Sequence, residues 1–212
     1  MIRYLIALLL LSFSINAETI NTGNILTNPT FGTGNTTTTT GWSTSGDDGI
    51  HTHGEWGFPY QTGMDDTGGV LAFEGHEEDN VYQDVDLVGD GHLTQPEMNQ
   101  GFTSTMGADV WFWNNIENTF TLKQTVTSSD GSVSTQVREI TGTSSTTGNK
   151  FTNYTNQYIQ GSNTQTDITI RAEVYNETAG TAYDNSHRGP DVDNVSLNIG
   201  YQYIPPINEE TQ

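Results

Sequence analysis

Short runs of β-branched and aromatic residues recur along this chain, and residues that favour turns separate them. Several runs alternate with a period of two: Phe120, Leu122 and Val126 fall on one face, and Thr121 and Lys123 on the other. Such alternation is typical of strands with one face in a core and the other in solvent. The pattern predicts seven strands, at Val70–Phe73, Val81–Leu87, Ala108–Trp113, Thr119–Thr127, Val133–Ile140, Ile168–Tyr175 and Val195–Tyr203.

Helix signals are confined to one segment. Thr94-Gln-Pro-Glu97 combines a capping box with a proline in the first turn, and Gly101 follows, which predicts a short helix over Gln95–Gln100. Ser129-Asp-Gly131 is a turn sequence between two expected strands and predicts a hairpin. Many short strands with little helix are the pattern of a β-sandwich.

The chain begins with a segment typical of a secretory signal peptide. Residues 1–17 carry one Arg, an apolar run and a small residue at the end. The apolar run is shorter than the roughly 20 residues that a membrane-spanning helix needs. We expect one β domain over residues 18–204, a polar tail over 205–212, and loops at Thr36–Thr40 and Thr141–Thr147. The prediction is a secreted or cell-surface protein without membrane insertion.

Charge and cysteine content limit the partners and the chemistry. Acidic residues outnumber basic ones 26 to 6, a net charge of −20. Nucleic acids and anionic lipids are bound through clusters of Lys and Arg, so we expect neither as a partner. The carboxylates either lie solvated on an extracellular surface or gather around divalent cations. The chain has no cysteine, which excludes disulfides, thiol catalysis and thiolate metal sites.

Three segments together resemble a known family. They are Asn24-Ile-Leu-Thr-Asn-Pro-Thr-Phe31 leading to Gly41-Trp42, Asn80-Val-Tyr-Gln-Asp-Val-Asp-Leu87, and Gly189-Pro-Asp-Val-Asp-Asn-Val-Ser-Leu197. This arrangement resembles the galactose-binding-like β-sandwich jelly rolls, which include many carbohydrate-binding modules of secreted bacterial proteins. The resemblance implies an all-β jelly-roll sandwich with one short helix, and a structural Ca²⁺.

The resemblance places that calcium ion where the opening loop meets the closing strand. Asp193 matches the position of the late carboxylate ligand, and Asp191 or a backbone oxygen near Phe31 and Trp42 could complete the shell. Ca²⁺ takes six to eight oxygen ligands, and loop carbonyls beside a carboxylate can supply them. The alternative is that Asp193 only caps or orients the start of the strand.

A second candidate calcium site comes from the residues alone. Asp86–Glu97 overlays a twelve-residue EF-hand loop, with Asp86 at position 1, Asp90 at 5, Gly91 at 6 and Glu97 at 12. Val88 removes the ligand at position 3, and a strand precedes the loop in place of a helix. The alternative is a glycine turn followed by a capped helical turn.

Aromatic residues carry the binding hypothesis. In Asp109-Val-Trp-Phe-Trp-Asn-Asn115, alternation puts Trp111 and Trp113 on one face of a strand, and Asn115 follows. Trp56 and Tyr60 lie in a loop that contains Gly and Pro. Indole rings stack on sugar rings, and nearby Asn, Asp and His side chains bind the hydroxyls. The alternative for the strand tryptophans is packing in the core.

Two histidines form a further candidate. His51 and His53 would share one face of a strand, with Glu55 close by, and could chelate Zn²⁺ or Cu²⁺. A third ligand at a recognisable spacing is missing. The pair is therefore also interpreted as surface polar groups, with His53 contacting a ligand.

The preferred function is a secreted, non-catalytic, lectin-like module that binds a polysaccharide or cell-surface glycan. Two alternatives stay open. One is a structural subunit of an extracellular layer, appendage or virion, which would self-associate. The other is a small secreted glycoside hydrolase, for which the abundant carboxylates suggest no particular acid pair. No catalytic residue is assigned.

Overall fold

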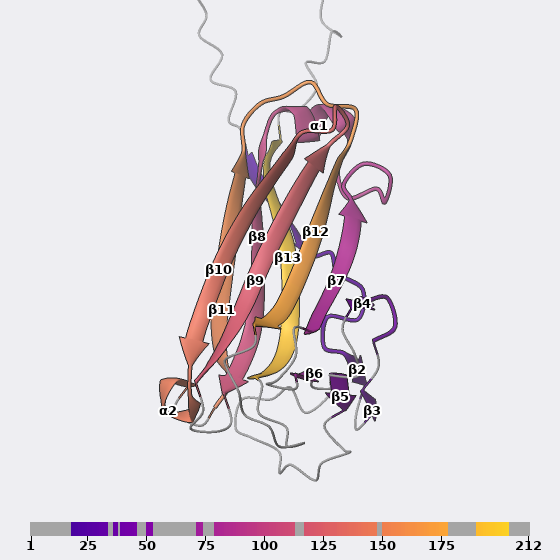
Figure 1. Ribbon diagram of the computed structural model, residues 1–212. Coiled ribbons are helices and arrows are strands. Elements are labelled where there is room, and N and C mark those ends of the chain that lie inside the picture. Colours follow the sequence, from indigo (N-terminus) through magenta and orange to yellow (C-terminus); the bar gives the residue numbers. More distant parts are fainter. Residues whose placement is uncertain are drawn as a thin grey trace, which may run out of the picture.

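The computed structural model shows two antiparallel sheets packed face to face, which confirms the all-β sandwich (Figure 1). It describes residues 18–33, 36–37, 39–45, 50–52, 71–73, 79–112, 117–147, 150–177 and 190–203. The expected signal peptide (1–17) and the tail (205–212) lie outside these ranges. Within them, no helix has the length and hydrophobicity needed to cross a membrane.

The first sheet, here sheet I, contains both ends of the described chain. Its order is β11-β8-β13-β6-β5, and β1 also pairs with β13. The strands are β1 (Glu18–Asn24), β5 (Ile50–Thr52), β6 (Leu71–Phe73), β8 (Phe102–Phe112), β11 (Thr152–Gln160) and β13 (Pro190–Tyr203). The long β13 therefore lies inside the sheet, hydrogen-bonded to β8 and to β1.

The second sheet, sheet II, lies in front of sheet I in Figure 1 and has the order β10-β9-β12-β7-β4. Its strands are β4 (Ser43–Ser45), β7 (Asp79–Asp86), β9 (Asn118–Ser128), β10 (Val133–Gly142) and β12 (Ile168–Glu177). The predicted hairpin joins β9 to β10: Gly131 has φ of 84°, and its N–H donates to the carbonyl of Ser128 at 2.9 Å. A small ribbon of β2 (Gly32–Thr33) and β3 (Thr36–Thr37) completes the described strands.

Two short helices lie at opposite ends of the sandwich (Figure 1). The predicted helix is confirmed as α1 (Gln95–Asn99), with Thr94 as N-cap and both bonds of the capping box present. The segment 141–147 is not the loop that we expected. Thr141 and Gly142 continue β10, and Ser144–Thr147 forms the four-residue helix α2.

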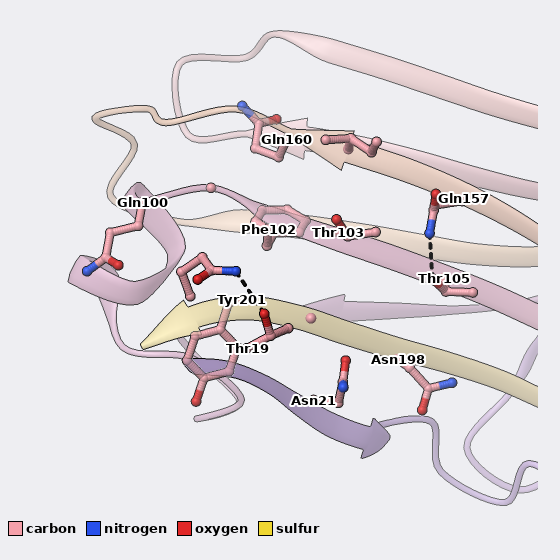
Figure 2. Close-up of a pocket in the computed structure, with 14 residues that line it drawn as sticks. Thr19, Asn21, Gln100, Phe102, Thr103, Thr105, Gln157, Gln160, Asn198 and Tyr201 are labelled. Atoms are coloured by element: carbon pink, nitrogen blue, oxygen red, sulfur yellow. Dashed lines mark hydrogen bonds between the residues drawn. The ribbon is translucent and has the colours of Figure 1, made fainter. Parts of the chain in front are cut away.

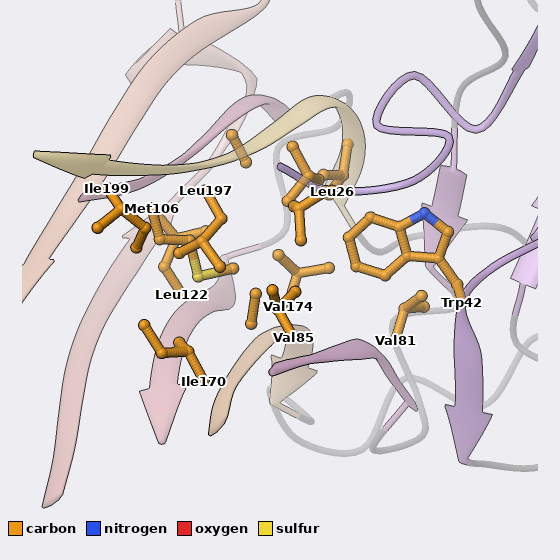
Figure 3. Close-up of a cluster of buried hydrophobic side chains, with 14 of the residues drawn as sticks. Leu26, Trp42, Val81, Val85, Met106, Leu122, Ile170, Val174, Leu197 and Ile199 are labelled. Carbon is orange, nitrogen blue, oxygen red and sulfur yellow. The ribbon is translucent and has the colours of Figure 1, made fainter. Parts of the chain in front are cut away.

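Strand alternation builds the core between the sheets (Figure 3). Sheet I supplies inward-facing side chains such as Met106, Leu197 and Ile199, each with 0% exposure. Sheet II supplies Leu122, Ile170, Val174, Val81 and Val85. Each such side chain stabilises the fold by about 1.5–3 kcal/mol through burial. The ring of Trp42 extends the same cluster past Val81. It packs on the ring of Phe31, with the ring centres 5.1 Å apart.

The opening loop is fastened to the closing strand by the side chain of Asn24. Its Nδ2 donates to the carbonyl of Val195 at 3.0 Å, and its Oδ1 accepts from the N–H groups of Leu197 and Leu26. The N–H of Val195 in turn donates to the carbonyl of Pro29 at 2.9 Å. These bonds join the first and last motifs of the family resemblance, 171 residues apart.

A buried polar network links the sheets beside β10 and β11. Gln124, with 0% exposure, donates from Nε2 to the carbonyl of Asn156 at 2.9 Å and accepts from Ser104 Oγ. Asn156 Nδ2 donates to the carbonyls of Leu122 at 3.2 Å and Gln136 at 3.0 Å. A satisfied network of this kind favours one register of the sheets over its alternatives.

The edge strands β10 and β11 meet along one side of the sandwich. The Arg138 guanidinium of β10 donates to the carbonyl of Thr155 in β11 and lies 5.4 Å from the ring centre of Tyr154. Val133 and Val137 of β10 remain exposed, at 60% and 47%. Side chains therefore cover part of the outer backbone of β10.

We predict that Asn24→Ala lowers the free energy of unfolding by about 1–2 kcal/mol, because two backbone N–H groups and one carbonyl lose their partner. Chemical denaturation measures the change. Asn21→Ala, at an exposed position in the same strand, is the control and should change stability by less than about 0.5 kcal/mol. Equal effects of the two substitutions would contradict the fastening role of Asn24.

Candidate functional site

The outer face of sheet II contains a shallow groove, here the charged groove, with a volume of about 560 Å³. Its lining comes from β7, β9, β10 and β12, and consists of Asp84, Lys123, Thr125, Thr127, Val133, Thr169, Arg171 and Glu173. These residues occupy the positions that alternate with the core residues of the same strands. Two of the six basic residues of the chain lie in this groove.

Strand register places the charges of the groove opposite one another. Arg171 of β12 pairs with Asp84 of β7, and their side chains form a bidentate bridge with N–O distances of 2.7 and 2.8 Å. Glu173 lies opposite Lys123 of β9, and Lys123 Nζ is 2.8 Å from Glu173 Oε2. Glu173 Oε1 also accepts a hydrogen bond from Asn80 Nδ2 at 2.7 Å. The hydrogen bonds to Asp84 raise the pKa of Arg171 above its ordinary value. Both pairs therefore hold their side chains in defined positions.

Two tyrosines extend this surface. The guanidinium of Arg171 lies 4.0 Å from the ring centre of Tyr82, and Lys123 Nζ lies 5.7 Å from the ring centre of Tyr175. Stacking on an aromatic face restricts the orientation of a cation and so pre-organises its remaining N–H donors. The groove offers a ligand oriented donors, oriented acceptors and ring surface.

The outer face of sheet I contains a second groove, here the amide groove, of about 390 Å³ (Figure 2). It crosses β1, β13, β8 and β11 and ends at the segment after α1. Its lining is Thr19, Asn21, Gln100, Gly101, Phe102, Thr103, Thr105, Gln157, Ile159, Gln160, Asn198, Gly200, Tyr201 and Gln202. Six of these fourteen residues carry amides, and none is Asp, Glu, Lys, Arg or His.

The EF-hand-like segment forms a tight loop. Asp86 Oδ1 accepts from the N–H groups of Val88 and Gly89, and Asp90 Oδ2 accepts from the N–H of Asp86. A Cβ at Gly89 would lie 2.3 Å from Asp86 Oδ2, so a larger residue there would displace the Asp86 carboxylate. Glu97 is engaged in the capping box, where its Oε2 accepts from the N–H and Oγ1 of Thr94. These bonds lower the pKa of Glu97. This geometry fits the turn-and-capped-helix interpretation, and calcium binding at Asp86, Asp90 and Glu97 stays a prediction.

Asp86 has a carboxylate neighbour that the sequence did not reveal. Asp167, which precedes β12, shares a hydrogen bond with it, and this bond is the main reason that the pKa of Asp86 is lowered. Burial, and then the bond and charge of Asp86, raise the pKa of Asp167. The two acids thus hold one proton between them in the acidic range. Across the described part of the chain, no three Asp, Glu or His side chains gather closely enough to hold a metal ion.

Asp191 and Asp193 are both buried in β13, at 3% and 1% exposure. Asp193 lies opposite Asp109 in β8, just before an irregularity in the strand pairing where Asn194 adopts φ of 49°. Asp193 Oδ1 accepts from the N–H of Asn194, and Asp109 accepts from the side chains of Asn194 and Asn153. This geometry fits the orienting role of Asp193. Calcium binding at Asp193 stays a prediction from the family resemblance.

The structure describes one of the predicted sugar-binding aromatics. Trp111 is 5% exposed and packs on Phe151, with ring centres 6.1 Å apart. So little of its indole is accessible that the ring has no free face for a sugar, and Trp111 instead belongs to the packing alternative. The other predicted ligand-contacting residues, Trp56, Tyr60, Trp113, His53 and Asn115, lie outside the described residues.

Comparison with known proteins gave similarity in structure alone. No protein-family model and no curated protein sequence matches the chain. The enzymatically active domain of tailspike protein 4 of bacteriophage CBA120 has 16% identity and a TM-score of 0.44; the match covers 82% of this chain and 21% of that one. This chain therefore spans about a fifth of the tailspike chain.

Two carbohydrate-binding modules match over nearly their whole length. TmCBM61, solved with β-1,4-galactotriose, has 15% identity and a TM-score of 0.41, with 82% of this chain and 97% of that chain covered. The CBM22-1 xylan-binding domain of Paenibacillus barcinonensis Xyn10C has 10% identity and a TM-score of 0.42, with 84% and 95% covered. Other similar structures include the CBM22-1-GH10 modules and the C-terminal family 22 carbohydrate-binding module of Clostridium thermocellum Xyn10B, with TM-scores of 0.44 and 0.40.

We predict that Asp167→Asn raises the melting temperature at pH 7 by about 2–4 °C. At that pH the carboxylates of Asp86 and Asp167 are both charged and repel each other. The amide side chain introduced at position 167 removes one of these charges and can still donate a hydrogen bond to Asp86. Because the pKa of Asp167 is raised, its own contribution to stability is fully present below the ordinary pKa of 3.8 and is lost as pH rises through its folded-state pKa. The gain should therefore shrink as pH falls toward 4.

Thermal melts between pH 4 and 7 measure this difference. Asp130→Asn is the control, because Asp130 is an exposed acid in the β9–β10 turn whose pKa is lowered by its bond from Ser132. Its replacement should not stabilise the protein at pH 7. A loss of stability in Asp167→Asn at pH 7 would contradict repulsion within the pair.

Proposed function

We propose that this protein is a secreted, non-catalytic carbohydrate-binding module that holds a polysaccharide or cell-surface glycan in the charged groove. The observation that carries the proposal is the fixed guanidinium of Arg171, bidentate to Asp84 and stacked on Tyr82. The side chains of Arg171 and Asp84 are 42% and 44% exposed, so a ligand can reach them. A sugar hydroxyl can accept from the guanidinium while its neighbour donates to the carboxylate.

The rest of the groove suits the same kind of ligand. Lys123, with a side chain 31% exposed, adds a second donor one strand away that the nearly buried Glu173 holds in place, and Thr125 and Thr169 add hydroxyl groups. Tyr82 and Tyr175 lie beneath the two cations and orient them at the groove.

The carboxylates of the groove support binding in preference to hydrolysis. Each carboxylate of the groove is already paired with a cation, Asp84 with Arg171 and Glu173 with Lys123, and this arrangement suits ligand binding. The hydrolase alternative would be supported by release of reducing sugar from a bound polysaccharide.

Export and the remaining alternative are tested separately. The signal-peptide pattern and the net charge of −20 support an extracellular or surface location without nucleic-acid binding or membrane insertion. The structural-subunit alternative requires self-association, which light scattering at micromolar concentrations would detect.

We predict that Arg171→Ala weakens glycan binding at least tenfold, because the donor fork and the cover of Tyr82 are both removed. Arg171→Lys keeps the charge but loses the bidentate geometry, and should also bind more weakly. The first probes are β-1,4-galactotriose and xylan oligosaccharides, followed by a wider array, with affinity measured by calorimetry.

Arg138→Ala is the matched control. Arg138 also lies over a tyrosine ring, that of Tyr154, but it is not among the residues that line the charged groove. It should bind as the wild type does. Equal affinity of Arg171→Ala and wild type for every ligand found would refute the charged groove as the binding site.

We predict that calcium raises the melting temperature and that Asp193→Asn abolishes this response. Asp193 is buried two residues before Val195, whose N–H donates to Pro29 of the opening loop, so an ion at Asp193 would strengthen the link between the loop and β13. Asp130→Asn, which replaces an exposed acid of the β9–β10 turn, is the control and should leave the calcium response unchanged. Identical melting with calcium and with chelator would refute the structural ion.

A further inference from the structure

We propose that the amide groove of sheet I is a second, independent binding site for an uncharged polysaccharide chain. It lies on the face of the sandwich opposite the charged groove. The site does not depend on the function proposed for sheet II, because it uses different strands and different residues. It would give one domain two glycan-binding surfaces.

The chemistry of the lining selects an uncharged ligand. An amide carries donors and an acceptor in one group, as a hydroxyl does, so each can pair with a sugar hydroxyl in either role. The lining has no Lys or Arg to attract a phosphate, sulfate or uronate, and the chain as a whole repels anions with its net charge of −20. A neutral sugar chain binds there without desolvating a charge.

Hydrogen bonds within the groove already orient two of its amides (Figure 2). Gln202 Nε2 donates to Thr19 Oγ1 at 2.8 Å across β13 and β1, and Gln157 Nε2 donates to Thr105 Oγ1 at 3.4 Å across β11 and β8. Each bond fixes one end of the amide and leaves its Oε1 to accept from a ligand. Pre-organised polar groups reduce the ordering cost of binding.

The shape of the groove suits an extended chain. It crosses four neighbouring strands, and three spacings of about 4.8 Å give a width of roughly 14 Å. Gly200 keeps the floor low between Asn198 and Gln202, since a Cβ there would lie 2.9 Å from Asn21 Oδ1. Ile159 at the β11 side is 70% exposed and offers apolar surface to the C–H face of a sugar ring.

A polar lining favours a glycan over a second copy of the chain. The buried centres of homodimer interfaces are mainly apolar, and Ile159 is the one strongly exposed aliphatic residue of this lining. Amide-rich surfaces are wetter and bind through many hydrogen bonds, as sugar-binding sites do. Self-association through this face is therefore an outcome that the experiment must separate.

The experiment measures binding to each groove in the full chain. Gln157→Ala/Asn198→Ala removes two amides from the amide groove, and Tyr82→Ala/Arg171→Ala disables the charged groove. Gln136→Ala, which removes an exposed glutamine of β10 outside both grooves, is the control. The probes are neutral hexasaccharides of xylose, glucose and galactose and, as the anionic comparison, hexagalacturonate. Far-ultraviolet circular dichroism and melting temperature verify the fold of each variant.

We expect the Tyr82→Ala/Arg171→Ala chain to retain binding of at least one neutral hexasaccharide. Gln157→Ala/Asn198→Ala, added to that background, should weaken this binding at least tenfold, and Gln136→Ala should not. The affinity should change less than twofold between 50 and 500 mM NaCl, because no ion pair forms. Hexagalacturonate should not bind this background.

Three results would overturn the proposal. The first is that the Tyr82→Ala/Arg171→Ala chain binds none of the neutral probes at millimolar concentration. The second is unchanged binding when Gln157 and Asn198 are replaced. The third is a dimer, detected by light scattering, that the same replacements dissociate, which would assign this face to self-association. If the unmodified chain binds the same probes, the first result also supports the charged groove as the binding site.

Discussion

The fold depends on the placement of the final strand inside a sheet. β13 is hydrogen-bonded to β8 on one side and to β1 on the other, so sheet I is complete only when both ends of the domain have met. Asn24 closes this arrangement with bonds to residues more than 170 positions away. The amide groove exists only because β1 and β13 lie side by side. The core and one binding surface therefore rest on the same long-range closure.

Each strand of the sandwich serves two purposes through its alternation. In β12, Ile170 and Val174 point into the core, while Arg171 and Glu173 lie on the outer face. Core packing thus fixes the backbone that carries the charged pairs. The partner strands β7 and β9 supply Asp84 and Lys123 at the opposing register positions. A rigid surface of this kind needs little rearrangement to receive a ligand.

Local signals in the sequence predicted the elements well where pattern and turn chemistry agree. The β9–β10 hairpin and the cap of α1 were predictable because Gly131 and the Thr94–Glu97 box act over a few residues. β11 was missed because Thr152–Gln160 is mostly polar and lies at an edge, where little burial is needed. The pairing of Arg171 with Asp84 spans 87 residues, and no local pattern specifies that register. The same holds for the contact of Asp167 with Asp86. Trp111 shows the converse limit, since alternation cannot distinguish a covered outer face from an accessible one.

The side of the sandwich where β10 meets β11 has a consequence for colloidal behaviour. An unpaired strand edge with exposed valines is a template on which another chain can add a strand and start edge-to-edge polymerisation. Here the side chains of Arg138 and Asn156 occupy carbonyls along that side, so an incoming strand would have to displace them before pairing. The charge of −20 adds repulsion between copies. A protein built in this way can remain dispersed at the high local concentrations that arise when many copies crowd onto one surface.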